Sequence, residues 1–334
     1  MNPAGFAFGS AARLACGIAA ALACGLWSAP LFAQEAAYPA RRITFMVLAP
    51  AAGPNDLLGR VLAERLSKTM GQPVIVENRP GGTAISATEA VARQAPDGYT
   101  VLQVPPAHVL SSMMGKVPFD PIASFDAVAH LVSTPFVLAV NPSVSARTLK
   151  EVVSLARANP GKLTYATAGP ASPHHLAGEL FKAMAGVDLL HVPYKGAAQI
   201  LQALATREVD MTFISVSQVR PLFANGQLFG IAVTTGTRTP LAPQLPTIAE
   251  AGGLPAYDVD VWIGALMTAG TPRPIVLRMN REMNQALADP QIAARLNNAG
   301  LVPQNTTPEA FLDLMKADQK RWGGLVRDLN LKLE

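Results

Sequence analysis

Short apolar runs alternate along this chain with amphipathic segments and Gly/Pro-rich turns, and this alternation restricts the fold more than any other feature. In the first half we expect strands at Ile43–Leu48, Val74–Glu77 and Tyr99–Val104, and helices between them at Asp56–Met70 and Ser86–Arg93. Gly71 is a typical residue for ending the first of these helices. Strands that alternate with helices predict an α/β fold, a parallel sheet covered by helices.

The alternation restarts further along the chain. We expect strands at Phe136–Val140, Leu163–Thr167, Leu189–Val192 and Val209–Phe213, with helices at Leu149–Ala158, Pro173–Ala185 and Ala197–Ala205. A returning strand at Trp262–Met267 and helices at Pro274–Ala288 and Pro308–Leu329 close the chain. Because 334 residues exceed one small core, we predict two lobes around a hinged cleft. Lobe 1 would hold residues 34–138, with 260–334 returning to it, and lobe 2 residues 139–259.

The first 33 residues have the pattern of a secretory signal peptide. Arg13 is the only charged residue before Glu35, and the apolar stretch Leu14–Trp27 follows it. A basic start, a short apolar run and a small residue before the cut predict cleavage after Ala33 and export to the periplasm. An uncleaved membrane anchor is a lower-ranked alternative.

Both cysteines of the chain, Cys16 and Cys24, lie inside this segment. A lipoprotein cut before Cys24 is therefore a second alternative, although Ala21–Ala23 fits the usual signal loosely. With cleavage after Ala33, the mature chain has no thiol for a disulfide, a metal or a nucleophile. No later apolar run reaches about 18 residues, so we expect no stable membrane insertion.

The charge pattern argues against a nucleic-acid partner. The net charge is +4, and the Lys and Arg residues are scattered rather than gathered in one stripe. His174 and His175 are adjacent, and neighbouring helical residues point about 100° apart, so they do not jointly face one metal. No Gly-x-Ser-x-Gly elbow or His-Glu-x-x-His helix occurs. We expect no metal, no cofactor and no catalytic residue.

Four expected helix starts are preceded by loops of small residues, at Pro50–Asp56, Asn78–Ser86, Ala168–Pro173 and His191–Gly196. Free backbone N–H groups and the positive end of the helix dipole make such places suitable for an anion. Each also has an ordinary interpretation as a capped helix, with Asn55 or Asp56 as one N-cap and Ser172 followed by Pro173 as another. Together they predict an anion site between the lobes, where the strands end.

Several ordered motifs resemble one family. They are Glu77-Asn78-Arg79-Pro80-Gly81, Ala95-Pro96-Asp97-Gly98-Tyr99-Thr100, Val117-Pro118-Phe119-Asp120-Pro121, His191-Val192-Pro193-Tyr194-Lys195-Gly196 and Pro246-Thr247-Ile248-Ala249-Glu250-Ala251-Gly252. The chain resembles the Bug-type, or TctC-type, receptors, the extracytoplasmic solute-binding proteins of tripartite tricarboxylate transporters. The motifs follow one another in order over essentially the whole mature chain.

The resemblance implies a type II periplasmic binding fold that closes on a small carboxylate without a cofactor, as a monomer that delivers it to a membrane permease. It also implies binding residues in both lobes. They are Ala49, Ala51, Ala52, Gly53, Asn55, Asp56, Gly81, Gly82, Thr83, Ala84 and Ser86 in the first lobe, and Thr167, Ala168, Gly169, Ser172, Lys195 and Ser215 in the second.

The sequence departs from the family pattern at the expected cleft. Ala49 stands where the family usually has Phe, and Ile214 stands where Asp is common. The loss of that carboxylate makes an amino-acid ligand less expected, and both changes predict a roomier, more apolar cleft. Two other functions remain open: a ligand-sensing module that signals to a receptor, and an enzyme, a hydrolase or isomerase, acting on an acid in the same cleft.

Overall fold

The computed structural model describes residues 38–80, 83–114, 117–170 and 172–328. The predicted signal segment, with Ala33 and Cys24, lies outside the described residues. The described residues from Arg41 onward form one compact body, which contains both α/β units of the fold.

The first α/β unit begins with three parallel strands, each followed by a helix. The strands are β1 (Ile43–Val47), β2 (Val74–Asn78) and β3 (Thr100–Val104), and the helices are α2 (Pro54–Met70), α3 (Thr83–Ala92) and α4 (Ala107–Met114). β1 lies between β2 and β3 and pairs in parallel with both. Gly71 ends α2 in the left-handed conformation, with φ of 73°, as predicted.

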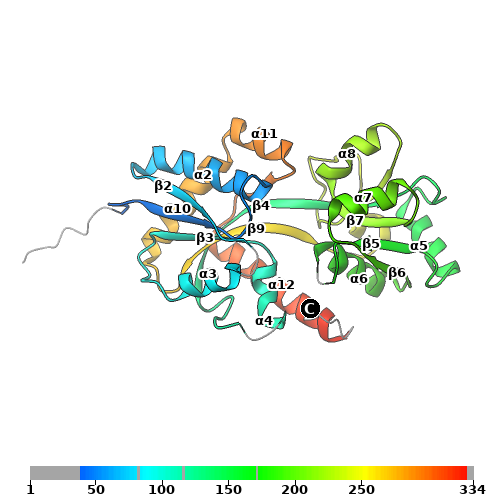
Figure 1. Ribbon diagram of the computed structural model, residues 1–334, viewed down its shortest axis with the longest axis horizontal. Helices are drawn as coiled ribbons and strands as arrows, with labels where there is room; N and C mark the ends of the chain where they lie inside the picture. The colour runs from blue at the N-terminus through cyan, green and yellow to red at the C-terminus, as the bar shows by residue number, and fades with distance from the viewer. Residues whose placement is uncertain (1–37, 81–82, 115–116, 171, 329–334) are drawn as a thin grey trace, which may run out of the picture. The chain divides into compact units, whose positions relative to one another are not determined.

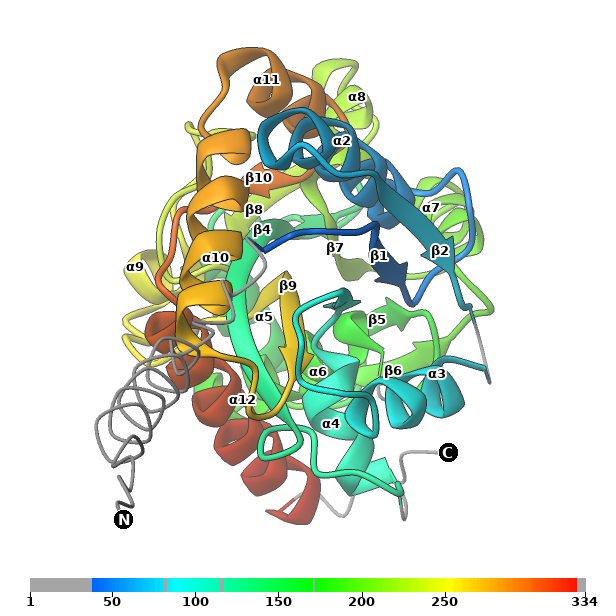
Figure 2. The ribbon, with the colours of Figure 1, turned by 90° about the vertical axis from the view of Figure 1, so that its left-hand side faces the viewer.

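Antiparallel strands and three C-terminal helices complete this unit. They are β4 (Phe125–Val140), β9 (Asp260–Thr268), β10 (Val302–Pro303), α10 (Arg273–Leu287), α11 (Pro290–Asn298) and α12 (Pro308–Asp328). β9 pairs with β3 on one side and with β4 on the other. Helices α2, α10 and α11 cover one face of the sheet, and α3, α4 and α12 cover the other (Figure 1, Figure 2). The C-terminal helices therefore return to the first unit.

The second α/β unit is built in the same way. Its elements are α5 (Leu149–Ala158), β5 (Thr164–Thr167), α6 (Pro173–Ala185), β6 (Leu190–Pro193), α7 (Ala197–Ala205), β7 (Met211–Ser215), α8 (Val216–Ala224), β8 (Phe229–Val233) and α9 (Ile248–Gly252). β5 pairs in parallel with β6 and β7. β7 and β8 flank the end of β4 in antiparallel pairing.

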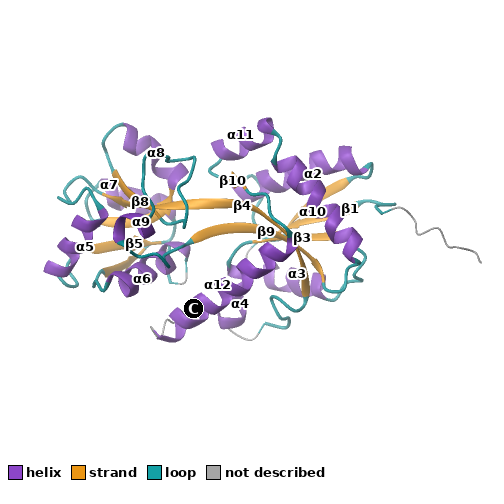
Figure 3. Ribbon diagram, turned by 180° about the vertical axis from the view of Figure 1, so that it is seen from behind, coloured by secondary structure: helices purple, strands orange, loops and turns teal. Residues whose placement is uncertain are grey.

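One strand, β4, belongs to both units. Phe125–Pro135 pairs with β9, and Phe136–Val140 pairs with β7 and β8, so β4 changes partners between Pro135 and Phe136. Figure 3 shows β4 and β9 continuing from one group of elements into the other. The sheet order is β2-β1-β3-β9-β4-β7-β5-β6, and the two units are joined through this pair.

The end of β4 is buried on both faces. Phe136, Leu138 and Val140 belong to a core shared with α5 and α6, while Val137 and Ala139 belong to a core shared with α7 and α8. This two-residue alternation follows from strand geometry, because successive side chains point to opposite faces. A strand covered on both sides appears in the sequence as a continuous apolar run, which explains why this half of β4 was predictable.

Three expectations about the elements are corrected. β4 begins eleven residues earlier than Phe136, because its first half carries polar residues and pairs with a distant strand. α3 begins at Thr83 rather than Ser86. The N-cap of α2 is Gly53, not Asn55 or Asp56, because Pro54 occupies the first turn, where its fixed φ suits a helix.

Candidate functional site

The loop between β1 and α2 is held in place by Asp56. Its carboxylate accepts hydrogen bonds from the Ala52 N–H at 2.9 Å, from Arg60 Nε at 2.8 Å and from Asn78 Nδ2 at 3.0 Å. Asn78 also donates to the Ala49 carbonyl oxygen at 3.1 Å. The Asp56 side chain is 4% exposed, and the bond from Arg60 lowers its pKa. Asp56 therefore fixes the predicted loop and ties it to β2.

This network leaves part of the loop facing outward. Ala51 and Ala52 are exposed, and Gly53 and Asn55 are partly buried. Ala52 adopts φ of 65°, a left-handed conformation that is costly for a residue with a side chain. The Asn55 carbonyl oxygen accepts a bond from Gln103 Nε2 at 3.0 Å, which ties the start of α2 to β3.

The loop between β2 and α3 is described only in part. Gly81 and Gly82 lie outside the described residues, and Thr83 and Ala84 form the first turn of α3. Ser86 is exposed on the same helix. Arg79 forms an ion pair with Glu77.

In the second unit, the loop between β5 and α6 is organised around Ser172. Ser172 is the N-cap of α6, as predicted: its Oγ accepts the His175 N–H at 3.3 Å and donates to the Gly169 carbonyl oxygen at 2.7 Å. Gly169 has φ of 100°, and its N–H donates to Thr167 Oγ1 at 3.1 Å. Ala168 is partly buried between Thr167 and Gly169. This is a tight turn whose shape requires glycine.

Two stacked histidine rings lie beside this turn. His191 Nε2 lies 2.6 Å from Thr167 Oγ1, and its ring stacks on that of His175 with the centroids 4.3 Å apart. Burial lowers the pKa of His191 to about 4 and also lowers the pKa of His175. Both lowered pKa values favour neutral rings, which pack against each other and hold the turn.

The last two candidate residues lie at the ends of β6 and β7, the two strands that flank β5. Lys195 is exposed, and its backbone N–H donates to Gln199 Oε1 at 3.0 Å at the start of α7. Ser215 ends β7, is 7% exposed, and its Oγ lies 3.0 Å from Ser217 Oγ. The described candidates thus lie at or after the carboxyl ends of β1, β2, β5, β6 and β7, the edge at which α/β sheets bind ligands.

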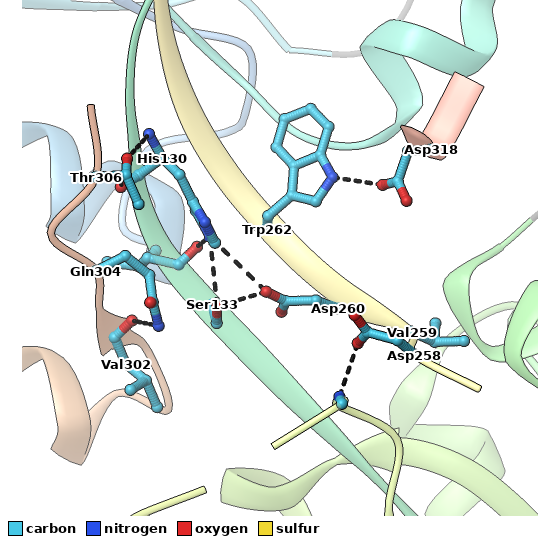
Figure 4. Close-up of polar contacts among 12 residues, drawn as sticks. His130, Ser133, Asp258, Val259, Asp260, Trp262, Val302, Gln304, Thr306 and Asp318 are labelled. Atoms are coloured by element: carbon cyan, nitrogen blue, oxygen red, sulfur yellow. Dashed lines mark hydrogen bonds and ion pairs between the residues drawn. The ribbon is translucent and has the colours of Figure 1, made fainter. Parts of the chain in front are cut away.

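Sequence reasoning missed a polar network on β4 and β9, beside the point where β4 changes partners. Ser133 Oγ donates to Asp260 Oδ2 at 2.5 Å, and His130 Nε2 lies 3.3 Å from Ser133 Oγ (Figure 4). The second oxygen of Asp260, Oδ1, is buried and has no hydrogen-bond partner among the described residues. The two strands are paired at this end, Pro135 with Asp260.

The same region carries two more carboxylates. Asp258 Oδ1 accepts the Gly236 N–H at 2.8 Å, and Asp318 Oδ2 accepts the indole N–H of the buried Trp262 at 2.6 Å. Burial raises the pKa of Asp260 to about 7, opposed by the Ser133 bond and reinforced by Asp258 and Asp318. The signal that would have revealed this network is pairing between distant strands, which a single sequence does not display.

This Ser–His–Asp group is not arranged for nucleophilic catalysis. In a catalytic triad the serine donates to the histidine, which acts as a base. Here Ser133 donates to Asp260, while His130 Nε2 lies 3.1 Å from the Val132 carbonyl oxygen. A carbonyl only accepts, so Nε2 carries the hydrogen, and burial lowers the pKa of His130 to about 4. The group instead joins β4 to β9.

A cavity of about 240 Å³ with both polar and apolar walls lies against this network. Its lining includes His130, Ser133, Asp258, Asp260 and Gln304. Among the described residues, no group of three His, Cys, Asp or Glu side chains is placed to hold a metal ion. In the same part of the chain, no helix has both the length and the apolar character needed to cross a membrane.

Comparison with known proteins identifies the class to which this fold and these loops belong. The solved R. palustris protein Rpa4515 with adipate is 32% identical, with a TM-score of 0.70, covering 88% of this chain and 99% of that one. MatC from Rhodopseudomonas palustris with bound malate is 29% identical, with a TM-score of 0.66, covering 86% and 100%. The fold is thus the two-lobed type II fold of periplasmic solute-binding proteins.

The family follows from the sequence comparisons. Residues 58–331 match the model of the tripartite tricarboxylate transporter family receptor, TctC, and the chain belongs to this family. A UPF0065 protein in the tcbD-tcbE intergenic region of Pseudomonas sp. strain P51 is 36% identical over 88% of both chains. Protein BugT of Bordetella pertussis is 31% identical over 89% of this chain and 92% of its own. The predicted resemblance is confirmed.

Proposed function

We propose that this protein is a periplasmic receptor that captures a small carboxylate, delivers it to a tripartite-tricarboxylate-type permease and performs no chemistry on it. The observation that carries the proposal is the position of the loops before α2 and α6, which begin where parallel strands end in each unit. Two structurally similar relatives were solved with carboxylates, adipate and malate. The arrangement of His130, Ser133 and Asp260 supports a receptor over an enzyme.

The ligand carboxylate would be held mainly by backbone N–H groups at these helix starts. Lys195→Ala is then expected to weaken binding by less than about 2 kcal/mol, because it removes one exposed charge. Gly169→Val is expected to abolish binding, because a β-branched residue is strained at φ of 100° and would displace the turn. Calorimetric titration measures both.

Gly226→Val is the matched control for Gly169→Val. Gly226 also has positive φ, 71°, with open space where a side chain would lie, but it follows α8 in an exposed turn. This control is expected to bind normally. If Lys195→Ala alone eliminated binding while Gly169→Val left it intact, the helix-start account would be wrong.

The direct test of function is a thermal-shift screen of small carboxylic acids. A ligand present at 100 times its Kd is expected to stabilise the protein by about 2.7 kcal/mol. Absence of a shift with every acid, or turnover of an acid by the purified protein, would reject the proposal. Co-purification with a sensor instead of a permease would favour the signalling alternative.

We also propose that binding closes two lobes, residues 34–138 with 260–334 and residues 139–259. Two observations support this closure. The first crossing between the units is β4, which changes partners between Pro135 and Phe136. The second is the segment that leads into β9, where the Val259 N–H donates to the Thr234 carbonyl oxygen at 2.8 Å. Both crossings between the units thus lie side by side. A ligand that touches both lobes binds the closed form more tightly and shifts the population toward it.

Small-angle scattering measures this closure. The radius of gyration is expected to fall when a confirmed ligand saturates the protein. A tightly bound ligand that leaves the radius unchanged, starting from a demonstrably open form, would exclude closure while leaving the carboxylate site intact.

A further inference from the structure

A small apolar cavity lies where α4 and α6 begin. Its volume is about 100 Å³, and residues of both units line it together with β9 and α12. The wall includes Pro106, Leu110, Pro173, Leu176, Val261 and Trp322. Leu110, Leu176 and Trp322 are 5%, 4% and 3% exposed, so the wall is fixed by the core behind it.

Residues that line the cavity are adjacent in sequence to the candidate loops or to the strands beside them. Pro173 follows Ser172, the N-cap of α6. Pro105 and Pro106 follow β3, which pairs in parallel with β1, the strand that precedes the first candidate loop. The cavity and the candidate loops therefore lie at the same edge of their sheets, where the parallel strands end.

The chemistry of the wall differs from that of the loops. A helix start usually offers free N–H groups, but Pro105, Pro106 and Pro173 have no N–H. Asp260 also lines the cavity; its Oδ2 is bound to Ser133, and its buried Oδ1 has no partner among the described residues, so the wall offers one carboxylate acceptor. A water molecule held stably in a cavity needs two to four polar partners, which this wall does not favour. The cavity suits carbon rather than a charged or hydroxylated group.

We propose that this cavity receives the apolar part of the carboxylate ligand, so that the protein selects unbranched aliphatic acids over compact hydroxylated ones. This inference rests on the proposed function, which supplies the carboxylate end. A cavity of about 150 Å³ holds benzene, so about 100 Å³ fits a short alkyl chain better than a ring. Each buried methylene contributes about 0.8 kcal/mol, which is about fourfold in affinity.

Titration of the full mature protein with unbranched monocarboxylates from acetate to hexanoate tests the proposal. The Kd is expected to fall about fourfold per methylene until the cavity is full. Pentanoate is expected to bind more tightly than 4-hydroxypentanoate, because a hydroxyl has at most one side-chain acceptor in this wall, Asp260 Oδ1, in place of the several hydrogen bonds that it makes in water. Equal affinity along the series would overturn the inference.

Ala107→Phe fills the cavity from its rim, because Ala107 lines it and is exposed at the first residue of α4. This variant is expected to bind acetate normally and to lose the gain with chain length. Ala158→Phe, at an exposed alanine that ends α5, is the matched control and is expected to keep the gain. If affinity still increased with chain length in Ala107→Phe, the proposal would be contradicted. Ala107→Leu is a second variant that fills less of the cavity and is read out in the same way.

The experiment separates the two hypotheses. If acids of every length bind equally, the carboxylate receptor stands and only the apolar subsite is wrong. If no acid binds the wild-type protein at any length, the proposed function itself is wrong, and the inference falls with it.

Discussion

At pH 8 the Asp260→Asn protein is expected to be more stable than the wild-type protein, and at pH 4 the two are expected to be equally stable. Burial raises the pKa of Asp260 to about 7, from a reference value of 3.8. Between pH 3.8 and about 7 the folded protein keeps a proton that the unfolded chain has lost, so the free energy of unfolding falls as the pH rises. A shift of about three units corresponds to about 4 kcal/mol at most.

Urea unfolding of both proteins at several pH values measures this difference. The comparison isolates Asp260 from remote groups such as the buried His108, which contribute equally to both proteins. Asp258→Asn, which removes a charge two residues away, is the comparison and is expected to show a smaller gain, because burial rather than the Asp258 charge is the main cause of the raised pKa of Asp260. A difference between Asp260→Asn and wild type that does not change with pH would show that Asp260 ionises normally.

Asp56→Ala is expected to lower both stability and ligand affinity. The substitution removes the hydrogen bonds that the Ala52 N–H and the Asn78 amide donate to the carboxylate, and a hydrogen bond to a charged group contributes about 1.5–3 kcal/mol. We expect a loss of about 2–4 kcal/mol in the free energy of unfolding. Ligand affinity should fall at least about tenfold, because the loop between β1 and α2 loses its fixed shape.

Glu64→Ala is the matched control on the same helix. Glu64 forms an exposed ion pair with Lys68 at 2.8 Å, and such pairs contribute little. Unfolding and titration of this variant are expected to match the wild-type protein. Full ligand affinity in Asp56→Ala would show that the first loop does not need this network to bind.

Much of the fold was predictable because its signals are local. The α5, α6 and α7 helices carry apolar spacing and recognisable ends over consecutive residues, and their predicted bounds agree with the structure. The first half of β4 was not predictable, because Asp126, His130 and Pro135 interrupt its apolar pattern. Its partner, β9, lies more than a hundred residues away in the sequence.

In the site, too, local signals were predictable and contacts between distant residues were not. Ser172 could be identified as an N-cap because the cap, the proline and the helix are adjacent in sequence. The Ser133–Asp260 bond joins residues 127 positions apart, so only the folded chain reveals it. The N-cap of α2 was missed because several polar residues near Pro54 were equally plausible.

The pairing of β4 with β9 has a consequence for how such receptors diverge. Two antiparallel strands that cross together bend readily across their plane but resist sliding past each other, since sliding breaks the bonds between Ser133–Pro135 and Asp260–Trp262. In the proposed closure, the rotation axis would then be set by this backbone pairing and not by the candidate loops. Loop sequences could change with the solute without moving the axis.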